Sequence, residues 1–181
     1  VEIEVADRST RRIQRHRAES GLPAGKTFAS FDFDAAPGLR KAHMLTLAAG
    51  EEWIDSGNNL LVFGQSGTGK SHAVAAIASA LIDAGRRVLF TRTTDMVQKL
   101  QTARRELALN AALDKLDKFD LICLDDLSYV RKDQAETSVL FELIAHRYER
   151  HSIAITANQP FSAWDQVFPD PAMTVAAIDR L

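Results

Sequence analysis

The chain has 181 residues, of which 46% are hydrophobic and 25% charged, and its formal net charge at pH 7 is −2. This size and composition are typical of one soluble globular domain with a sizeable core, and they argue against a second full domain. The small net charge gives no overall electrostatic case for nucleic acid, the single cysteine excludes an internal disulfide framework, and no apolar run suggests a membrane span, so a cytoplasmic location is expected.

The first predicted element is a short basic helix over residues 7–20. Four of its arginines recur with the i, i+3, i+4, i+7 spacing of one helix face and form a cationic stripe: Arg8, Arg11, Arg12 and Arg15. Such a stripe can follow the phosphates of DNA, but a solvated helix face balanced by nearby acidic residues explains it equally well. The sequence leaves both interpretations open.

An irregular connector follows over residues 21–37, where glycines and prolines interrupt regular structure. It carries three closely spaced aromatic residues, Phe28, Phe31 and Phe33. We expect at least two of them to pack against the domain, and stacking on adenine is the alternative.

A complete phosphate-binding loop comes after a predicted helix over residues 39–55 and an apolar strand over residues 59–63. The loop fits the pattern GxxxxGK[ST], and an alanine-rich helix over residues 71–82 follows it. Its glycines let main-chain N–H groups wrap around phosphates, Lys70 reaches the β- and γ-phosphates, and the Ser71 hydroxyl can ligate Mg²⁺. The loop consists of Gly64, Gln65, Ser66, Gly67, Thr68, Gly69, Lys70 and Ser71.

Strands and helices alternate downstream of the loop. Strands are predicted over residues 87–91, 120–125 and 152–156, and helices over residues 94–110 and 134–150. Alternation of this kind predicts an α/β fold, a P-loop NTPase in which a parallel sheet lies between helices and the ligand binds at the carboxyl ends of the strands.

Two carboxylates end the third predicted strand. Asp125 and Asp126 follow the apolar residues 121–124, which is the Walker B pattern. We expect Asp125 in the shell of Mg²⁺ and Asp126 beside the attacking water, which it orients or deprotonates. Asp126 stands where glutamate is more common, and its shorter side chain predicts slow hydrolysis. The alternative is that Asp126 only caps a turn near Ser128.

An amide after the fourth predicted strand completes the expected site. A parallel sheet places Asn158 beside the γ-phosphate, where it can position the attacking water between the two Walker elements. A plain turn residue before Pro160 is the alternative. The double acid and the amide favour NTPases that hydrolyse ATP to drive assembly or motion, and they argue against a metabolic P-loop kinase.

These residues together resemble the IstB-type ATP-binding proteins, the AAA+ helpers of insertion-sequence transposition, which are related to bacterial DnaC-type helicase loaders. The resemblance is carried by residues 26–33, the phosphate-binding loop, and the stretches 121–150 and 155–181. It covers essentially the whole chain. The last two stretches are far more specific than the Walker motifs, which all P-loop NTPases share.

The resemblance implies an AAA+ ATPase that binds ATP and Mg²⁺ and oligomerises on double-stranded DNA, with ATP between subunits. It also implies that the protein recruits or stimulates a partner transposase. The loop and the Walker B pair keep the roles given above, and Asn158 becomes the first sensor. Arg180 lies where relatives place an arginine finger that acts on a neighbouring subunit, with a helix-surface arginine as the alternative.

The resemblance further implies segments that this chain does not contain. Relatives start earlier and continue into a fifth strand, a lid and a second sensor arginine, so we expect a piece of a longer protein. Residues 1–37 are then the tail of a DNA-binding region, and residues 38–181 the AAA+ core. In the family's strand order 5-1-4-3-2 the strand before the loop lies at an open edge, and impaired hydrolysis is expected.

Three other functions stay open at this point. A helicase loader of DNA replication is the second candidate, because Walker chemistry does not separate relatives that share one fold. A metabolic P-loop kinase and a DNA-binding structural protein that ignores ATP are the alternatives from other classes.

Overall fold

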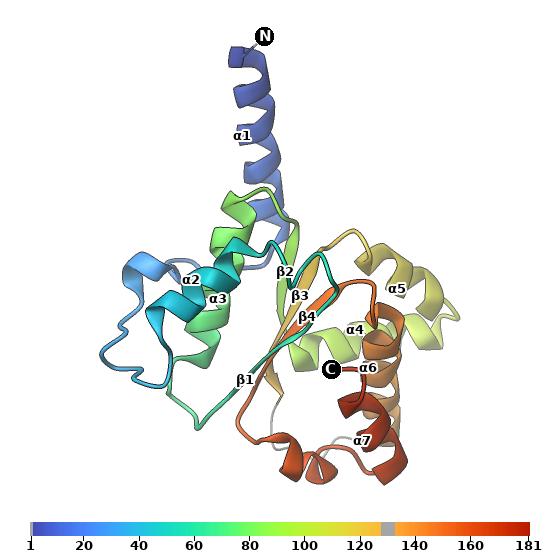
Figure 1. The fold of residues 1–181 in the computed structure, drawn as a ribbon. Helices are drawn as coiled ribbons and strands as arrows, with labels where there is room; N and C mark the ends of the chain where they lie inside the picture. The colour runs from blue at the N-terminus through green and yellow to red at the C-terminus, as the bar shows by residue number, and fades with distance from the viewer. Residues whose placement is uncertain (1, 128–132) are drawn as a thin grey trace.

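Four parallel strands form the centre of the molecule (Figure 1). The computed structural model describes residues 2–127 and 133–181. Across the sheet the strand order is β1-β4-β3-β2, and all three neighbouring pairs are parallel. The predicted α/β fold is confirmed, and each strand begins within one residue of its expected position. The strands are β1 (Leu60–Phe63), β2 (Val88–Arg92), β3 (Leu121–Leu127) and β4 (Ser152–Ala157).

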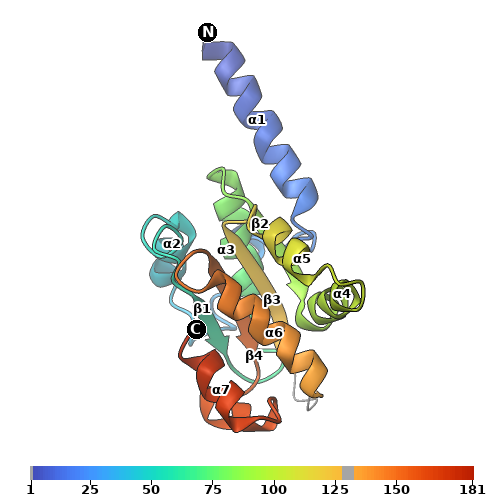
Figure 2. The ribbon, with the colours of Figure 1, turned by 90° about the vertical axis from the view of Figure 1, so that its right-hand side faces the viewer.

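Helices cover both faces of the sheet (Figures 1 and 2). β3 shows why, because its alternating apolar side chains point to opposite faces. Leu121 and Cys123 pack with α3 (Lys70–Asp83) on one face, whereas Ile122 and Leu124 pack with α4 (Thr93–Arg105) and α6 (Gln134–Arg147) on the other. Burial raises the pKa of the Cys123 thiol, which keeps it protonated and inert. The helices are α2 (Lys41–Ala49), α3 (Lys70–Asp83), α4 (Thr93–Arg105), α5 (Leu109–Leu116), α6 (Gln134–Arg147) and α7 (Pro171–Ile178), and the 3-10 helix η2 (Phe161–Gln166) precedes α7.

The first helix, α1 (Glu2–Glu19), begins earlier than predicted and projects away from the sheet (Figures 1 and 2). Its last turn is anchored. Arg17 Nη1 donates to Ser79 Oγ of α3 at 3.1 Å, and Arg87 Nε next to β2 donates to Glu19 Oε2 at 3.0 Å. The Arg87 guanidinium also lowers the pKa of the Glu19 carboxyl. One end of α1 is therefore held against the core, and the other extends beyond it.

The connector between α1 and α2 packs over α3 and contains the 3-10 helix η1 (Phe28–Ser30). Phe31 is buried, and Phe28 and Phe33 are partly buried against the same apolar cluster. The ring centroids of Phe31 and Phe33 are 4.7 Å apart. The expected packing role of these rings is confirmed, while a functional boundary at residue 37 stays a prediction.

Three helix ends differ from the sequence-based expectation. The helix predicted over residues 39–55 is α2, which already ends at Ala49, because Gly50 takes a left-handed φ of 70°. α4 ends at Arg105, because Leu107 takes a left-handed φ of 57° and Ala108 N–H turns back to donate to Ala103 O at 2.8 Å. The following α5 was not predicted. α6 ends at Arg147, three residues before the end of the helix predicted over residues 134–150, and the following Tyr148 is 42% exposed. No helix in the described part of the chain combines the length and the apolar character that crossing a membrane requires.

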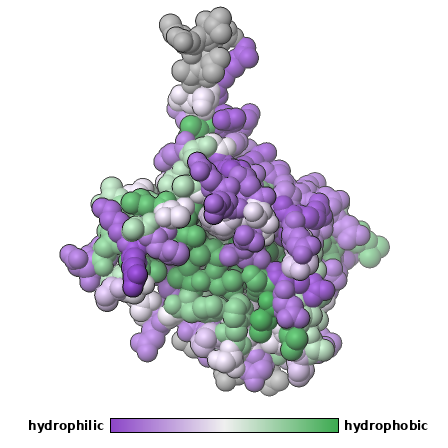
Figure 3. Space-filling view, in the orientation of Figure 1, coloured by the Kyte–Doolittle hydropathy of each residue, from purple (hydrophilic) through white to green (hydrophobic). Residues whose placement is uncertain are grey.

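β1 lies at one edge of the sheet, and β4 is its neighbour. This agrees with the 1-4-3-2 part of the expected order. An apolar groove of about 420 Å³ runs beside β1 and is lined in part by Leu39, Met44 and Ile77. Apolar surface gathers in the middle of this face (Figure 3). A fifth strand at this edge stays a prediction from the resemblance.

Candidate nucleotide-binding site

The phosphate-binding loop connects β1 to α3 and depends on two glycines with left-handed backbone. Gly67 has a φ of 82° and Gly69 a φ of 85°, values that other residues adopt only with strain. Gly69 is also the N-cap residue directly before α3, so the free N–H groups of the first helical turn start inside the loop. In the described structure Lys70 Nζ donates to Gln65 O at 2.7 Å, and Thr68 Oγ1 donates to the same oxygen at 2.8 Å. The loop is therefore closed on itself, with an anion site at the start of α3.

The acidic pair lies on a bulge in β3. Leu124 pairs with Ile155 of β4, but the next paired residues are Leu127 and Ala157, so β3 contains one extra residue there. Asp126 has a φ of 56°, in the left-handed region that aspartate tolerates better than most residues. Its side chain is exposed. The bulge thus turns the second carboxylate out of the strand.

One buried hydroxyl connects both acids. Thr156 of β4 accepts a hydrogen bond from the Asp126 N–H at 2.8 Å and donates one to Asp125 Oδ1 at 2.7 Å. Thr156 is 1% exposed. Sequence reasoning treated it only as the end of a strand. Its signal was a single polar residue within the apolar stretch 153–157.

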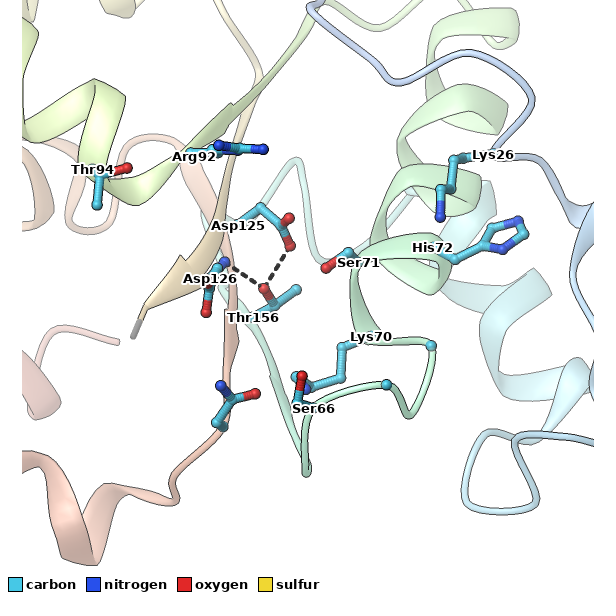
Figure 4. Close-up of a pocket in the computed structure, with 13 residues that line it drawn as sticks. Lys26, Ser66, Lys70, Ser71, His72, Arg92, Thr94, Asp125, Asp126 and Thr156 are labelled. Carbon is cyan, nitrogen blue, oxygen red and sulfur yellow. Dashed lines mark hydrogen bonds between the residues drawn. The ribbon is translucent and has the colours of Figure 1, made fainter. Parts of the chain in front are cut away.

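A cavity of about 630 Å³ brings the predicted motifs together (Figure 4). The Ser71 hydroxyl and the Asp125 carboxylate both face it, and hard oxygen donors of this kind suit Mg²⁺, so the residues present fit the predicted metal. Asn158 lines the same cavity from the bend after β4. The predicted residues that line it are Ser66, Gly67, Gly69, Lys70, Ser71, Asp125, Asp126 and Asn158.

Five lining residues were not predicted as site residues: Lys26, His72, Arg92, Thr94 and Thr156. Lys26 comes from the connector and Arg92 from the carboxyl end of β2, so two cations from distant segments face the place where phosphates are expected (Figure 4). His72 Nε2 lies 3.2 Å from both Thr27 O and Ser30 Oγ, which ties the connector to the first turn of α3. Only the tertiary structure brings these segments to one cavity.

Three loop residues lie outside this cavity. Gly64 and Thr68 line a neighbouring cavity of about 330 Å³, into which Lys70 also extends. Gln65 contributes its carbonyl oxygen to the closed loop and lines neither cavity. The alternative role of Asp126, capping a turn near Ser128, concerns a residue outside the described part of the chain.

Arg180 lies after α7 and away from the cavity of its own chain. Its guanidinium is 5.4 Å from the centroid of the Phe141 ring and 6.0 Å from that of Tyr148, both from the α6 region. Its Nη1 donates to Ala176 O at 2.7 Å. A role on a neighbouring subunit stays a prediction.

The cationic stripe runs along α1, from its projecting part to the part beside the core, where the Arg12 guanidinium lies next to Gly85. Its arginines Arg8, Arg11, Arg12 and Arg15 are all exposed. Arg11 Nη2 lies 2.6 Å from Asp7 Oδ2, one of the acidic residues that the solvated-face interpretation invokes. DNA binding by the stripe stays a prediction. The sequence contains a further basic pair that could contact DNA, Arg131 and Lys132, and it lies outside the described residues.

A cluster of possible metal ligands lies elsewhere, between α5 and α6: Asp114, Asp117 and His146. His146 Nε2 is 3.1 Å from Asp117 Oδ2, and Arg150 Nη2 donates to the same oxygen at 2.9 Å. Because an arginine already neutralises this carboxylate, the arrangement is best described as an ion-pair network.

The known proteins that this chain resembles are described as ATP-binding proteins, which agrees with the phosphate-binding loop and the cavity. The profile of the family described as "IstB-like ATP binding protein" matches residues 1–181. An insertion-sequence ATP-binding protein of Sinorhizobium fredii is 66% identical over 181 residues, which are 100% of this chain and 61% of that protein. The IS21 ATP-binding protein of Pseudomonas aeruginosa is 32% identical over 174 residues, which are 96% of this chain and 65% of that protein. The chain therefore spans less than two thirds of either relative.

Solved structures share the fold. The match to AMPPCP-bound DnaA from Aquifex aeolicus has a TM-score of 0.73 at 18% identity. It covers 90% of this chain and 50% of the DnaA chain. The match to the DnaC helicase loader has a TM-score of 0.65 at 21% identity. It covers 77% of this chain and 83% of the DnaC chain. The fold is that of AAA+ P-loop domains.

Proposed function

The chain belongs to the family of IstB-like ATP-binding proteins, and from this premise we propose that it hydrolyses ATP as a helper of insertion-sequence transposition. In this proposal the protein oligomerises on double-stranded DNA, with ATP between subunits, and recruits or stimulates a transposase. The observation that carries hydrolysis is the cavity shared by the loop, the acidic pair and Asn158. The loop is enough for binding, whereas the acidic pair and the amide are the groups that hydrolysis uses.

The loop binds the triphosphate. N–H groups at the start of α3 and the Lys70 ammonium attract the phosphate oxygens, so Lys70 exchanges Gln65 O for phosphate when nucleotide enters. Ser71 and Asp125 are the residues that would hold Mg²⁺. When bound, Mg²⁺ supplies positive charge to the phosphate oxygens.

Asp126 and Asn158 act on the water. The amide of Asn158 holds the water in place, and the Asp126 carboxylate orients it or accepts its proton. The water oxygen forms a bond to the γ-phosphorus while the bond from that phosphorus to the β–γ bridging oxygen breaks. ADP and inorganic phosphate are the products.

The main test is ATP turnover by the natural protein that contains these residues, with and without duplex DNA. We expect DNA to stimulate phosphate release, and we expect both Lys70→Ala and Asp126→Asn to abolish it. Lys70→Ala should lose nucleotide binding as well, whereas Asp126→Asn should keep it. Transfer of the phosphoryl group to a small metabolite instead of water would refute the proposal.

DNA binding is assigned to the exposed stripe on α1. Changing Arg11, Arg12 and Arg15 together to alanine should weaken retention of duplex DNA and flatten its dependence on salt, because fewer counterions are released. Arg104 and Arg105 at the end of α4 provide the matched control pair. If only the control change weakens binding, the DNA contact lies on α4.

Arg180 is assigned to the ATP site of a neighbouring subunit. Its place outside the cavity of its own chain supports this assignment. Arginine fingers raise hydrolysis by about 10³- to 10⁵-fold. Neither Arg180→Ala nor Lys70→Ala should be active alone, but a mixture should recover part of the turnover, because an intact site then forms between unlike subunits. No recovery in a mixture that forms mixed oligomers contradicts the assignment.

A helicase loader is the second candidate, supported by the likeness to DnaC at a TM-score of 0.65. The 66% identity to an insertion-sequence protein favours transposition, since 21% identity to DnaC supports the fold alone. Stimulation by a replicative helicase and not by a transposase would reverse this order.

The AAA+ fold weighs against a metabolic kinase. A cytoplasmic location stays a prediction.

A further inference from the structure

The Thr156 hydroxyl is the one group in the described structure that hydrogen-bonds to both acids of the cavity (Figure 4). It has a single hydrogen, and because it accepts from the Asp126 N–H it gives that hydrogen to Asp125 Oδ1. The two distances, 2.8 and 2.7 Å, are those of well-formed hydrogen bonds. The direction of both bonds is therefore determined.

The β3 bulge explains why a side chain is needed here. An extra residue in a bulge loses its regular partner on the next strand. The residues on either side of Thr156 pair with Leu124 and Leu127, so the Asp126 N–H has no place in the regular ladder and is satisfied by the hydroxyl. The same hydroxyl thus maintains the left-handed backbone that turns the Asp126 carboxylate into the cavity.

The second bond orients the other acid. With Oδ1 of Asp125 bound to Thr156, Oδ2 accepts no hydrogen bond from a described residue. Figure 4 shows the Asp125 carboxylate and Ser71 on facing sides of the cavity. Groups that orient metal-binding carboxylates in this way contribute about 10- to 100-fold to metal affinity or activity.

We propose that Thr156 is a positioning residue for ATP hydrolysis, which holds Asp125 toward Mg²⁺ and Asp126 toward the attacking water through one hydroxyl. This inference rests on the proposed function, since it assigns the acids the roles given there. Thr156 itself touches neither nucleotide nor water in this assignment. Its effect must therefore appear through the metal and the rate, not through nucleotide binding as such.

The test compares Thr156→Val, which removes the hydroxyl at nearly constant shape, with Thr156→Ser, which keeps it. Thr137→Val is the matched control, because Thr137 is also fully buried and its hydroxyl faces only main-chain oxygens at the start of α6, Asp133 O and Gln134 O. The affinity for a fluorescent ATP analogue is measured in Mg²⁺ and in EDTA, together with kcat and KM for ATP. Circular dichroism reports whether each variant is folded.

Thr156→Val should lower kcat by about 10- to 100-fold. The increase in nucleotide affinity that Mg²⁺ provides should fall by the same factor. Its affinity in EDTA should stay within about twofold of the parent, because the loop is intact. Thr156→Ser should recover most of both quantities, and Thr137→Val should change neither. If Thr156→Val does not fold, Thr156→Cys takes its place, since a thiol keeps the volume but is a weak donor.

Two outcomes overturn the inference while the proposed function stands. In the first, the parent is active and Thr156→Val keeps its Mg²⁺ effect and kcat. In the second, Thr156→Ser is as impaired as Thr156→Val, so that packing and not the hydroxyl is responsible. A parent protein that shows neither turnover nor an effect of Mg²⁺ on nucleotide affinity refutes the proposed function, and the inference falls with it.

Discussion

The left-handed backbone at Asp126 predicts that one substitution will stabilise the fold and strongly slow hydrolysis. At a φ of 56°, a side chain costs about 1–2 kcal/mol, somewhat less for aspartate, and glycine avoids this cost. The Asp126 side chain is exposed and makes no hydrogen bond to a described residue, so its removal loses no packing. Asp126→Gly therefore separates the effect of Asp126 on the stability of the fold from its contribution to hydrolysis.

The magnitude follows from two opposing terms. Relief of the backbone contributes about 1 kcal/mol, and the greater freedom of glycine in the unfolded chain takes back about 0.5 kcal/mol. The net gain of about 0.5 kcal/mol should raise the melting temperature by about 1–2 °C in a chain of this size. Loss of the carboxylate should lower kcat by about 10²- to 10⁴-fold, while ATP affinity stays within about twofold.

Thermal melts and phosphate-release assays on Asp126→Gly measure both effects, and Leu107→Gly is the matched control. Leu107 has nearly the same φ, 57°, but is 96% exposed at the end of α4 and away from the cavity. Leu107→Gly should therefore raise the stability by a similar amount and leave kcat unchanged. The reasoning is refuted if Asp126→Gly melts several degrees lower than the parent, or if it keeps more than a tenth of the parent kcat.

Three other predictions concern separate parts of the molecule. Asn158→Ala should lower kcat by about 100-fold without weakening ATP binding, because the amide acts on the water; equal losses in both would assign it to the nucleotide. Arg147→Met should destabilise the fold by about 3 kcal/mol or more in urea titrations, since the buried guanidinium, whose pKa burial lowers to about 10, donates to three buried carbonyl groups; a loss below 1 kcal/mol would contradict this. The hydrogen bond from Arg87 lowers the Glu19 pKa below its ordinary 4.5, so the stability that Glu19 adds over Glu19→Gln is present above pH 4.5 and should be lost as the pH falls from there through the lowered pKa. A pH-independent difference would exclude the ion pair as its source.

Much of the fold could be predicted because its signals are local. Apolar runs and alternation located all four strands, and the loop pattern placed the start of α3 one residue from its observed position. The errors occurred where tertiary contacts or chain reversals decide. The helix expected over residues 94–110 is divided by the left-handed turn at Leu107, a conformation that a leucine does not signal.

The site residues also divide into those that the sequence predicts and those that only the tertiary structure brings to the cavity. The residue types and spacing of the loop and of the double acid identified phosphate-binding and water-activating groups, since that chemistry depends on short stretches of chain. Lys26, Arg92 and Thr156 could not be found this way. Each reaches the cavity from a different segment, and only the packing of those segments brings them together.

The sequence by itself determined the fold class, the family resemblance and the groups that can handle a nucleotide, because neighbouring residues encode them. The tertiary structure alone decided the bulge in β3, the hydroxyl that connects Asp125 to Asp126, and the anchoring of α1 on α3 and β2. The physical reason is that strand register and helix packing join residues about 30 to 70 positions apart. Such pairings are selected by the packing of the whole core, so no short stretch of the chain specifies them alone.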